Sequence, residues 1–140
     1  MKCKDVMTPN PRACAPSASS VEAARIMRDE DVGIVPVVEQ NQLKGVVTDR
    51  DLCLEVIAEA RNPQEVKVSE CMSEDLVTCK QDDDVQKAAD LMKEHQVRRI
   101  PVVDDQGRLV GMIAQADIAL KLGEPEEVTE TIKKISKPAA

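Results

Sequence analysis

Hydrophobic and polar residues alternate along the chain with two periods, and each period occurs twice. In residues 19–30 and 83–95, apolar residues recur every three or four positions, which predicts two amphipathic helices. Ser19 begins a capping box with the acid three residues later, and Asp83 or Asp84 can cap the second helix. One face of the second helix is predicted to be buried: Val85, Ala88, Ala89 and Met92.

Two short runs rich in β-branched residues follow each helix and are separated by a polar turn. The first pair is "IVPVV" at 34–38 and "LKGVVT" at 43–48, and the second is "IPVVD" at 100–104 and "RLVGMIA" at 108–114. Each pair predicts a β-hairpin. Because the proline inside "PVV" has no N–H to donate, we expect it at the start or the edge of a strand.

The chain repeats itself at an offset of 65 residues, which becomes 66 after the polar turn. "GVVTDRDL" at 45–52 returns as "GMIAQADI" at 111–118, with the threonine replaced by alanine and the last aspartate kept. We predict two modules of strand-helix-strand-strand-helix, residues 1–62 and 63–123. So few strands cannot bury both faces of a sheet, so the two modules are expected to pack on each other.

The remaining residues, 124–140, are predicted to form a terminal helix and tail. Pro125 suits a first helical turn, acids precede lysines as the helix dipole favours, and apolar residues share one face. Those apolar residues are Val128, Ile132 and Ile135.

Composition and charge narrow the class of partner. The 140 residues are 42% hydrophobic and contain no Phe, Tyr or Trp, so aliphatic side chains must fill the core and must line any site for a ring. The net charge of -7 disfavours nonspecific binding to nucleic acid or anionic lipid. No apolar run reaches the roughly 18 residues of a membrane span.

The cysteines and the first residues indicate a cellular compartment. The five cysteines are odd in number and contain no CxxC, and "MKCKDVMTPN" has no apolar segment for secretion. We therefore expect a reducing, cytoplasmic location. The cysteines are expected to behave as small buried hydrophobes, with Cys3 the most exposed thiol.

The order of helix, "PVV", turn, "G-hydrophobic-hydrophobic-T-x-x-D" and helix, present twice, resembles a tandem pair of CBS domains, named from cystathionine β-synthase and often called a Bateman module. The resemblance covers about residues 1–122. It implies an α/β (α+β) fold whose two modules pack sheet to sheet with pseudo-twofold symmetry. It also implies two clefts for an adenosine-containing ligand such as AMP, ADP, ATP or S-adenosylmethionine.

The resemblance gives roles to individual residues. Asp51 and Asp117 are expected to bind ribose, and Thr48, Arg98 and Arg99 to bind phosphate. Three residues stand where the other copy has a phosphate ligand: Ala114 in place of Thr48, and Gly33 and Ile34 in place of the two arginines. The opposite module is expected to line each cleft: Thr8, Ala13, Val32 and Gly33 beside Asp117, and Ser73, Thr78, Val97 and Arg98 beside Asp51.

These residue types suit the chemistry, and each has a structural alternative. A carboxylate accepts hydrogen bonds from two vicinal hydroxyls, and a hydroxyl with backbone N–H groups at a helix start receives an anion. Thr48 and Asp51 also have the spacing of a capping box. Arg98 and Arg99 can instead form a solvated strand edge, or serve one cleft each, because neighbouring strand residues face opposite ways.

No catalytic or metal site is expected. The single histidine, His95, ends a helix, and its distance from the scattered cysteines makes a poor zinc set. The acids of "QDDDV" at 81–85 are interpreted as a helix cap. The function predicted is regulatory: a homodimer that senses an adenine nucleotide and acts in signal transduction through an unknown effector protein. The alternative is an oligomerisation or docking module without a ligand, with an enzyme or a nucleic-acid binder ranked below both.

Overall fold

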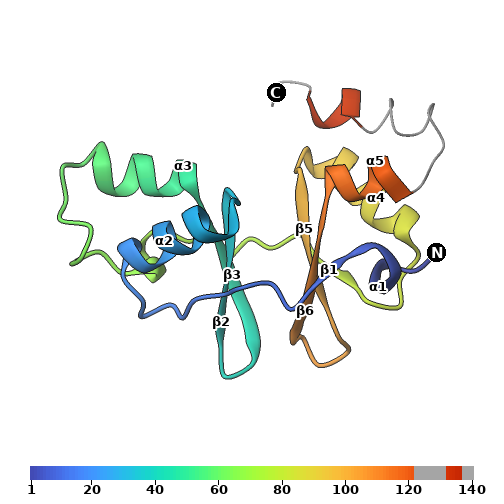
Figure 1. Ribbon diagram of the computed structural model, residues 1–140, viewed down its shortest axis with the longest axis horizontal. Helices are drawn as coiled ribbons and strands as arrows, with labels where there is room; N and C mark the ends of the chain where they lie inside the picture. The colour runs from blue at the N-terminus through green and yellow to red at the C-terminus, as the bar shows by residue number, and fades with distance from the viewer. Residues whose placement is uncertain (122–131, 137–140) are drawn as a thin grey trace. The chain divides into compact units, whose positions relative to one another are not determined.

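The structure is a computed structural model that describes residues 1–121 and 132–136 (Figure 1). Helices α1–α5 span Cys3–Val6, Ser20–Glu30, Asp49–Leu52, Val85–His95 and Gln115–Lys121, a π-helical turn η1 spans Cys53–Ile57, and a 3-10 turn η2 spans Val68–Glu70. Strands β1–β6 span Thr8–Pro9, Ile34–Glu39, Gln42–Thr48, Cys79–Lys80, Arg99–Val103 and Leu109–Ala114. The mixed α+β content confirms the predicted fold class.

Both predicted long helices form, and side chains cap them as their sequences indicate. The Ser19 hydroxyl accepts a hydrogen bond from the Glu22 N–H of α2 at 3.2 Å, and the Asp84 carboxylate accepts one from the Gln86 N–H of α4 at 2.8 Å. Asp84, and not Asp83, is therefore the N-cap of α4. The predicted apolar face of α4 is buried.

The two predicted hairpins also form. Strand β2 pairs antiparallel with β3, and β5 pairs antiparallel with β6. The expected edge position of the proline is wrong in the second copy, because Pro101 lies inside β5 and β5 has neighbours on both sides. The missing N–H is tolerated there because β4 pairs only with Val102 and Val103 of β5.

The structure forms two compact units, and each combines segments from both copies of the repeat, whose predicted bounds 1–62 and 63–123 stay a prediction. The central unit comprises residues 12–76, and the terminal unit comprises residues 1–11 with 77–140. Each hairpin recruits the first segment of the other copy: β1 pairs with β6, and Ser73 exchanges two backbone hydrogen bonds with Val46 of β3, at 2.9 and 3.0 Å. Unpaired backbone groups along β3 and β6 give the physical reason, because a neighbouring segment satisfies them.

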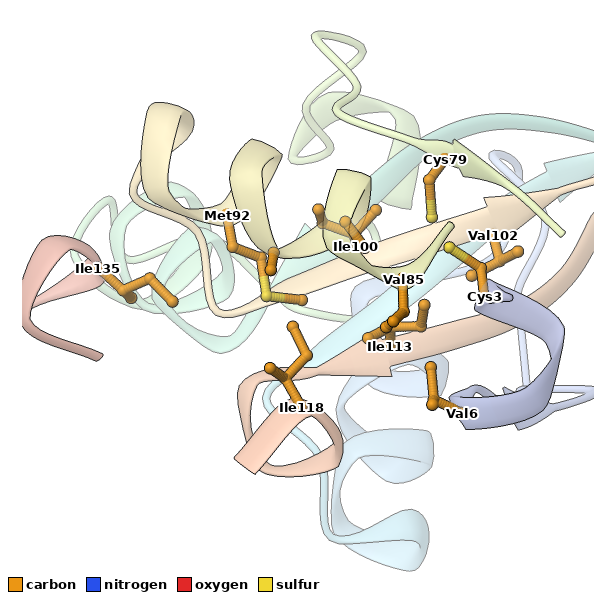
Figure 2. Packing of buried hydrophobic residues seen from close by; sticks show 12 residues of the cluster. Cys3, Val6, Cys79, Val85, Met92, Ile100, Val102, Ile113, Ile118 and Ile135 are labelled. Carbon is orange, nitrogen blue, oxygen red and sulfur yellow. The ribbon is translucent and has the colours of Figure 1, made fainter. Parts of the chain in front are cut away.

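The terminal unit holds a four-stranded sheet in the order β1-β6-β5-β4. Helices α4 and α5 lie on one side of β5 and β6 (Figure 1). Figure 2 shows aliphatic and sulfur-containing side chains from the helices and strands meeting in one core. The largest fully buried members of this core are Met92, Ile100, Ile113 and Ile118.

The central unit has its own core, built on the β2–β3 hairpin. Helices α2 and α3 lie on one side of this hairpin (Figure 1). Val35, Val37 and Val47 are completely buried, and Val66 and Val68 from the start of the second copy complete the core. Because each unit needs apolar residues from both copies, neither half of the sequence contains a whole core.

Close approach of the recruited segments explains the glycine of the repeated phrase. A Cβ on Gly45 would lie 2.6 Å from the Ser73 carbonyl oxygen, and one on Gly111 would lie 3.0 Å from the Thr8 carbonyl oxygen and 2.8 Å from the Met7 Cγ. Such distances require the neighbour to move. Glycine at these two positions therefore lets each segment lie against the hairpin.

Part of the predicted terminal helix is described. Residues 132–135 are helical, and Ile135 is buried in the core of the terminal unit while Ile132 is 37% exposed. Pro125 and Val128 lie outside the described residues. Within residues 1–121 and 132–136, no helix has the length and hydrophobicity needed to cross a membrane.

Candidate functional site

The predicted ligand residues of each copy gather at the end of its hairpin, and those within the strands lie on the sheet face that turns away from the core. Ile34 pairs with Thr48 in the central unit, as Arg99 pairs with Ala114 in the terminal unit. Their strand neighbours Val35, Val47, Ile100 and Ile113 are completely buried. Because successive strand residues face opposite ways, these two pairs lie on the other face.

We name the two groups by their aspartates and define them by equivalent positions. The Asp51 half-site consists of Gly33, Ile34, Thr48, Asp49, Arg50 and Asp51. The Asp117 half-site consists of Arg98, Arg99, Ala114, Gln115, Ala116 and Asp117. The matched strand pairs and the matched backbone hydrogen bonds, Asp49 N–H to Gly33 C=O at 3.0 Å and Gln115 N–H to Arg98 C=O at 2.8 Å, show that these positions are structurally equivalent.

In the Asp51 half-site, Thr48 and Asp51 form a reciprocal capping box at the start of α3. The Thr48 Oγ1 accepts a hydrogen bond from the Asp51 N–H at 3.1 Å, and the Asp51 Oδ2 accepts one from the Thr48 N–H at 2.9 Å. The structural alternative from the sequence is thus confirmed. It leaves room for a ligand role, since the Asp51 carboxylate has a second oxygen and the Thr48 hydroxyl retains a hydrogen to donate.

Asp117 adopts the same position without the threonine. Its Oδ2 accepts a hydrogen bond from the Ala114 N–H at 2.8 Å, which reproduces half of the capping box. Ala114 has no hydroxyl to accept a bond from the Asp117 N–H. The carboxylate orientation is therefore set by the backbone bond alone, and it is the feature that both half-sites share.

The sequence analysis did not identify Asp49, whose carboxylate lies next to Gly33 in the Asp51 half-site. A Cβ built on Gly33 would lie 3.1 Å from the Asp49 Oδ2 and 3.6 Å from its Oδ1. The Asp49 Oδ1 also accepts a hydrogen bond from the Arg50 N–H at 2.8 Å. The signal was present in the repeat, because the equivalent position in the second copy is the neutral Gln115.

Both arginines belong to the Asp117 half-site, but they occupy different backbone environments. Arg98 precedes β5 and its side chain is exposed, whereas Arg99 begins β5 and is partly buried. Arg99 lies opposite Ala114 on the neighbouring strand, so the two side chains share one sheet face. The Arg98 backbone bonds to Gln115, the first residue of α5.

The predicted cleft-lining residues divide between the two units. Thr8 pairs with Met112 of β6 and lies in the unit of Asp117, and Ser73 bridges to Val46 of β3 in the unit of Asp51. The other assignments join residues of different compact units and stay predictions. They place Ala13, Val32 and Gly33 with Asp117, and Thr78, Val97 and Arg98 with Asp51.

The cysteines lie outside both half-sites, and the expectation for Cys3 is wrong. Cys3 is completely buried because its N–H donates to the Asp83 carbonyl at 2.8 Å, and Cys53 is the exposed thiol. Burial raises the pKa of the Cys3 and Cys79 thiols and raises that of Cys14 to about 11. The described part of the chain has no group of three or more His, Cys, Asp or Glu side chains that could hold a metal ion.

The family model for the CBS domain matches this chain twice, at residues 3–58 and 68–124. The chain belongs to the CBS domain family. CBS domain-containing protein YhcV of Bacillus subtilis is 41% identical over 133 residues, which cover 95% of this chain and 94% of YhcV. Hypoxic response protein 1 of Mycobacterium tuberculosis is 30% identical over 138 residues, which cover 98% of this chain and 95% of that protein.

Solved structures of CBS domain proteins share the fold. The crystal structure of Hypoxic Response Protein I with two coordinated zinc ions has a TM-score of 0.79 at 30% identity, covering 86% of this chain and 98% of that one. The crystal structure of CBSX2 in complex with AMP has a TM-score of 0.73 at 28% identity, covering 88% of this chain and 98% of that one. The crystal structure of the CBS domain pair of protein MJ0100 in complex with 5′-methylthioadenosine and S-adenosyl-L-methionine has a TM-score of 0.74 at 28% identity. It covers 88% of this chain and 96% of that one.

Proposed function

We propose that this CBS domain pair is a regulatory module that binds adenosine ligands through Asp51 and Asp117 and acts on a partner protein without catalysing a reaction. One observation carries the proposal: both copies keep a carboxylate at the start of a helix, where the backbone N–H of the last strand residue holds it. In the second copy this carboxylate persists although the capping threonine is lost. The Asp117 carboxylate still accepts from the Ala114 N–H through Oδ2, and its other oxygen can accept hydrogen bonds from ribose hydroxyls.

The ligands in similar solved structures indicate the class of ligand. Two structures at 28% identity contain adenosine compounds: AMP in CBSX2, and 5′-methylthioadenosine with S-adenosyl-L-methionine in MJ0100. These ligands share an adenine and a ribose and differ at the 5′ position. An adenosine ligand recognised by its ribose hydroxyls is thus the common chemistry, and the aspartates of this chain suit it.

Calorimetric thermal unfolding with a ligand panel tests the proposal. The panel contains AMP, ADP, ATP, NAD, 5′-methylthioadenosine and S-adenosylmethionine. A ligand at about a hundred times its Kd stabilises by roughly 2.7 kcal/mol, which raises the Tm by several degrees for a domain of this size. We expect at least one selective shift that is lost in the double variant Asp51→Ala/Asp117→Ala.

The control variant is Glu39→Gln, which removes an exposed carboxylate at the other end of β2. It is expected to keep the full ligand shift. If no ligand shifts the Tm of the wild-type protein at millimolar concentration, adenosine binding is wrong and the docking module without a ligand is the better description.

We also propose that the protein is a homodimer. Each copy exposes an apolar side chain at the same position after its hairpin: Leu54 is 48% exposed and Leu120 is 82% exposed, and Ile57 adds a side chain that is 73% exposed. Large exposed apolar residues at repeated positions favour burial against another chain. Light scattering should give a dimer for the wild-type protein and a monomer for Leu54→Glu/Leu120→Glu, and a wild-type monomer at micromolar concentration would contradict the proposal.

A further inference from the structure

We infer that the two half-sites select adenosine ligands that differ in charge at the 5′ position. The Asp117 half-site takes an adenosine bearing a 5′ phosphate. The Asp51 half-site takes an adenosine whose 5′ group is neutral or cationic, such as a thioether or a sulfonium. This inference rests on the proposed function and deepens it, because it names a ligand class for each half-site.

The charges at equivalent positions carry the first part of the argument. The Asp51 half-site contains two carboxylates, Asp49 and Asp51, and one guanidinium, Arg50. The Asp117 half-site contains one carboxylate and two guanidiniums, Arg98 and Arg99. One carboxylate in each is assigned to ribose, so the groups left for the 5′ end are one carboxylate and one guanidinium in the Asp51 half-site and two guanidiniums in the Asp117 half-site. Like charges repel and opposite charges attract, most strongly where water is displaced.

The geometry at Gly33 shows where the charges of the two half-sites differ. Where the second copy carries the Arg98 side chain, the first copy has no side chain, and the Asp49 carboxylate lies over the vacated position, 3.1 Å from an ideal Cβ. The Asp49 backbone bonds to Gly33 at 3.0 Å, and the Arg50 N–H holds its Oδ1 at 2.8 Å. A carboxylate thus lies beside the residue that is equivalent to Arg98.

Backbone donors at this position are also occupied. The N–H groups of Thr48, Arg50 and Asp51 donate to Asp51 Oδ2, Asp49 Oδ1 and Thr48 Oγ1 respectively. A phosphate at the Asp51 half-site would therefore compete with intramolecular acceptors for these three donors and would face the Asp49 carboxylate. A thioether needs no donor, and a sulfonium is attracted by the carboxylate.

AMP and 5′-methylthioadenosine form a matched pair of probes, because they share adenosine and differ in a dianionic phosphate against a neutral thioether. Isothermal titration of Asp117→Ala isolates the Asp51 half-site, and titration of Asp51→Ala isolates the other. We expect Asp117→Ala to bind 5′-methylthioadenosine at least tenfold more tightly than AMP. We expect Asp51→Ala to show the reverse preference by at least tenfold.

A conversion variant tests the residues named. Gly33→Arg/Asp49→Gln gives the first copy the groups of the second, and the two changes are made together because a side chain at 33 needs the space that Asp49 occupies. In the Asp117→Ala background it should reduce the preference for 5′-methylthioadenosine at least tenfold. Asp49→Asn, which preserves shape, should reduce it in the same direction if the conversion variant fails to fold. Glu39→Gln is the matched control and should leave the preference unchanged.

The two proposals fail differently. AMP binding to Asp117→Ala as tightly as 5′-methylthioadenosine, or an unchanged preference in Asp49→Asn, would overturn the charge selection and leave adenosine binding intact. Absence of binding by both probes to the wild-type protein at millimolar concentration would overturn both proposals.

Discussion

The two copies of the repeated phrase share their scaffold and differ in their chemistry. In both copies a glycine lies under a recruited segment, a buried valine or isoleucine faces the core, and an aspartate is held by a backbone N–H. Around that aspartate the first copy has a threonine and a second acid, while the second copy has an alanine and two arginines. The residues that make the fold are thus repeated, and the residues that would meet the 5′ end of a ligand are not.

The largest expected effect compares the two cores. Met27 and Met92 occupy equivalent positions in α2 and α4, with exposures of 8% and 0%. Truncating a buried methionine to alanine costs about 2–5 kcal/mol, depending on how far the site can collapse. We expect Met92→Ala to lie in the upper part of this range and Met27→Ala in the lower part.

Urea unfolding followed by far-ultraviolet circular dichroism measures this difference, since the chain has no tryptophan or tyrosine to serve as a fluorescent probe. Equal losses of unfolding free energy, or a larger loss for Met27→Ala, would show that the two cores do not differ as their exposures indicate.

The next effect compares the two glycines of the repeated phrase. An added Cβ at Gly45 meets a backbone carbonyl at 2.6 Å, whereas at Gly111 the nearest atoms belong to the flexible side chain of Met7. Overpacking costs about 1–3 kcal/mol, and a side chain can move more easily than a backbone. We expect Gly45→Ala to lower the unfolding free energy more than Gly111→Ala, as measured by urea unfolding, and the opposite order would contradict the arrangement of the recruited segments.

A smaller effect concerns the threonine that the second copy lacks. Thr48→Ala removes the acceptor of the Asp51 N–H and should cost about 0.5–2 kcal/mol, the usual loss for an N-cap. The reverse change, Ala114→Thr, should stabilise the protein because it completes the box at Asp117. Urea unfolding of the two variants measures whether each unfolding free energy changes in the expected direction. An unchanged unfolding free energy in Thr48→Ala would show that the capping box has no net effect on stability.

At neutral pH the smallest effect on stability is expected from the cysteine thiols, whose contribution changes only at alkaline pH. Cys14 and Cys79 occupy equivalent buried positions, and burial raises the pKa of both thiols, that of Cys14 to about 11. The unfolded chain therefore loses these protons at lower pH than the folded chain. The free energy of unfolding should fall as the pH rises from about 9 to about 11.

Thiol labelling separates the exposed cysteine from the buried ones. With an aromatic disulfide reagent at pH 8, one thiol per native chain should react fast, namely Cys53. Cys53→Ser should abolish this fast phase, and the remaining four thiols should react after unfolding. Two or more fast thiols in the native wild-type protein would contradict the burial of Cys3, Cys14, Cys71 and Cys79.

Local features of the fold could be predicted from the sequence because local interactions determine them. The two long helices follow from their apolar period and their caps, and the hairpins follow from β-branched runs around polar turns. The exchange of first segments could not be predicted in this way. Strand β1 is only two residues long and Ser73 forms an isolated bridge, so neither segment carries a periodic signal, and their pairing depends on partners in the other copy. Cys3 was misjudged for the same reason, because a distant backbone carbonyl holds it in the core.

The candidate site was predictable only in part. The spacing of Thr48 and Asp51 indicates their mutual hydrogen bonds, and the resemblance to CBS domains supplied the ribose and phosphate roles. Asp49 was missed because its position at the start of α3 depends on the absence of a side chain at Gly33, which precedes β2. Only the folded hairpin brings those two residues together.

The most direct test of the account is the stoichiometry of ADP binding in the two single-aspartate variants, measured by equilibrium titration. The account predicts at most one tight ADP per wild-type chain, retained in Asp51→Ala and lost in Asp117→Ala, because the arginines belong to the Asp117 half-site. Equal losses in the two variants, or loss in Asp51→Ala alone, would contradict the division of chemistry between the copies.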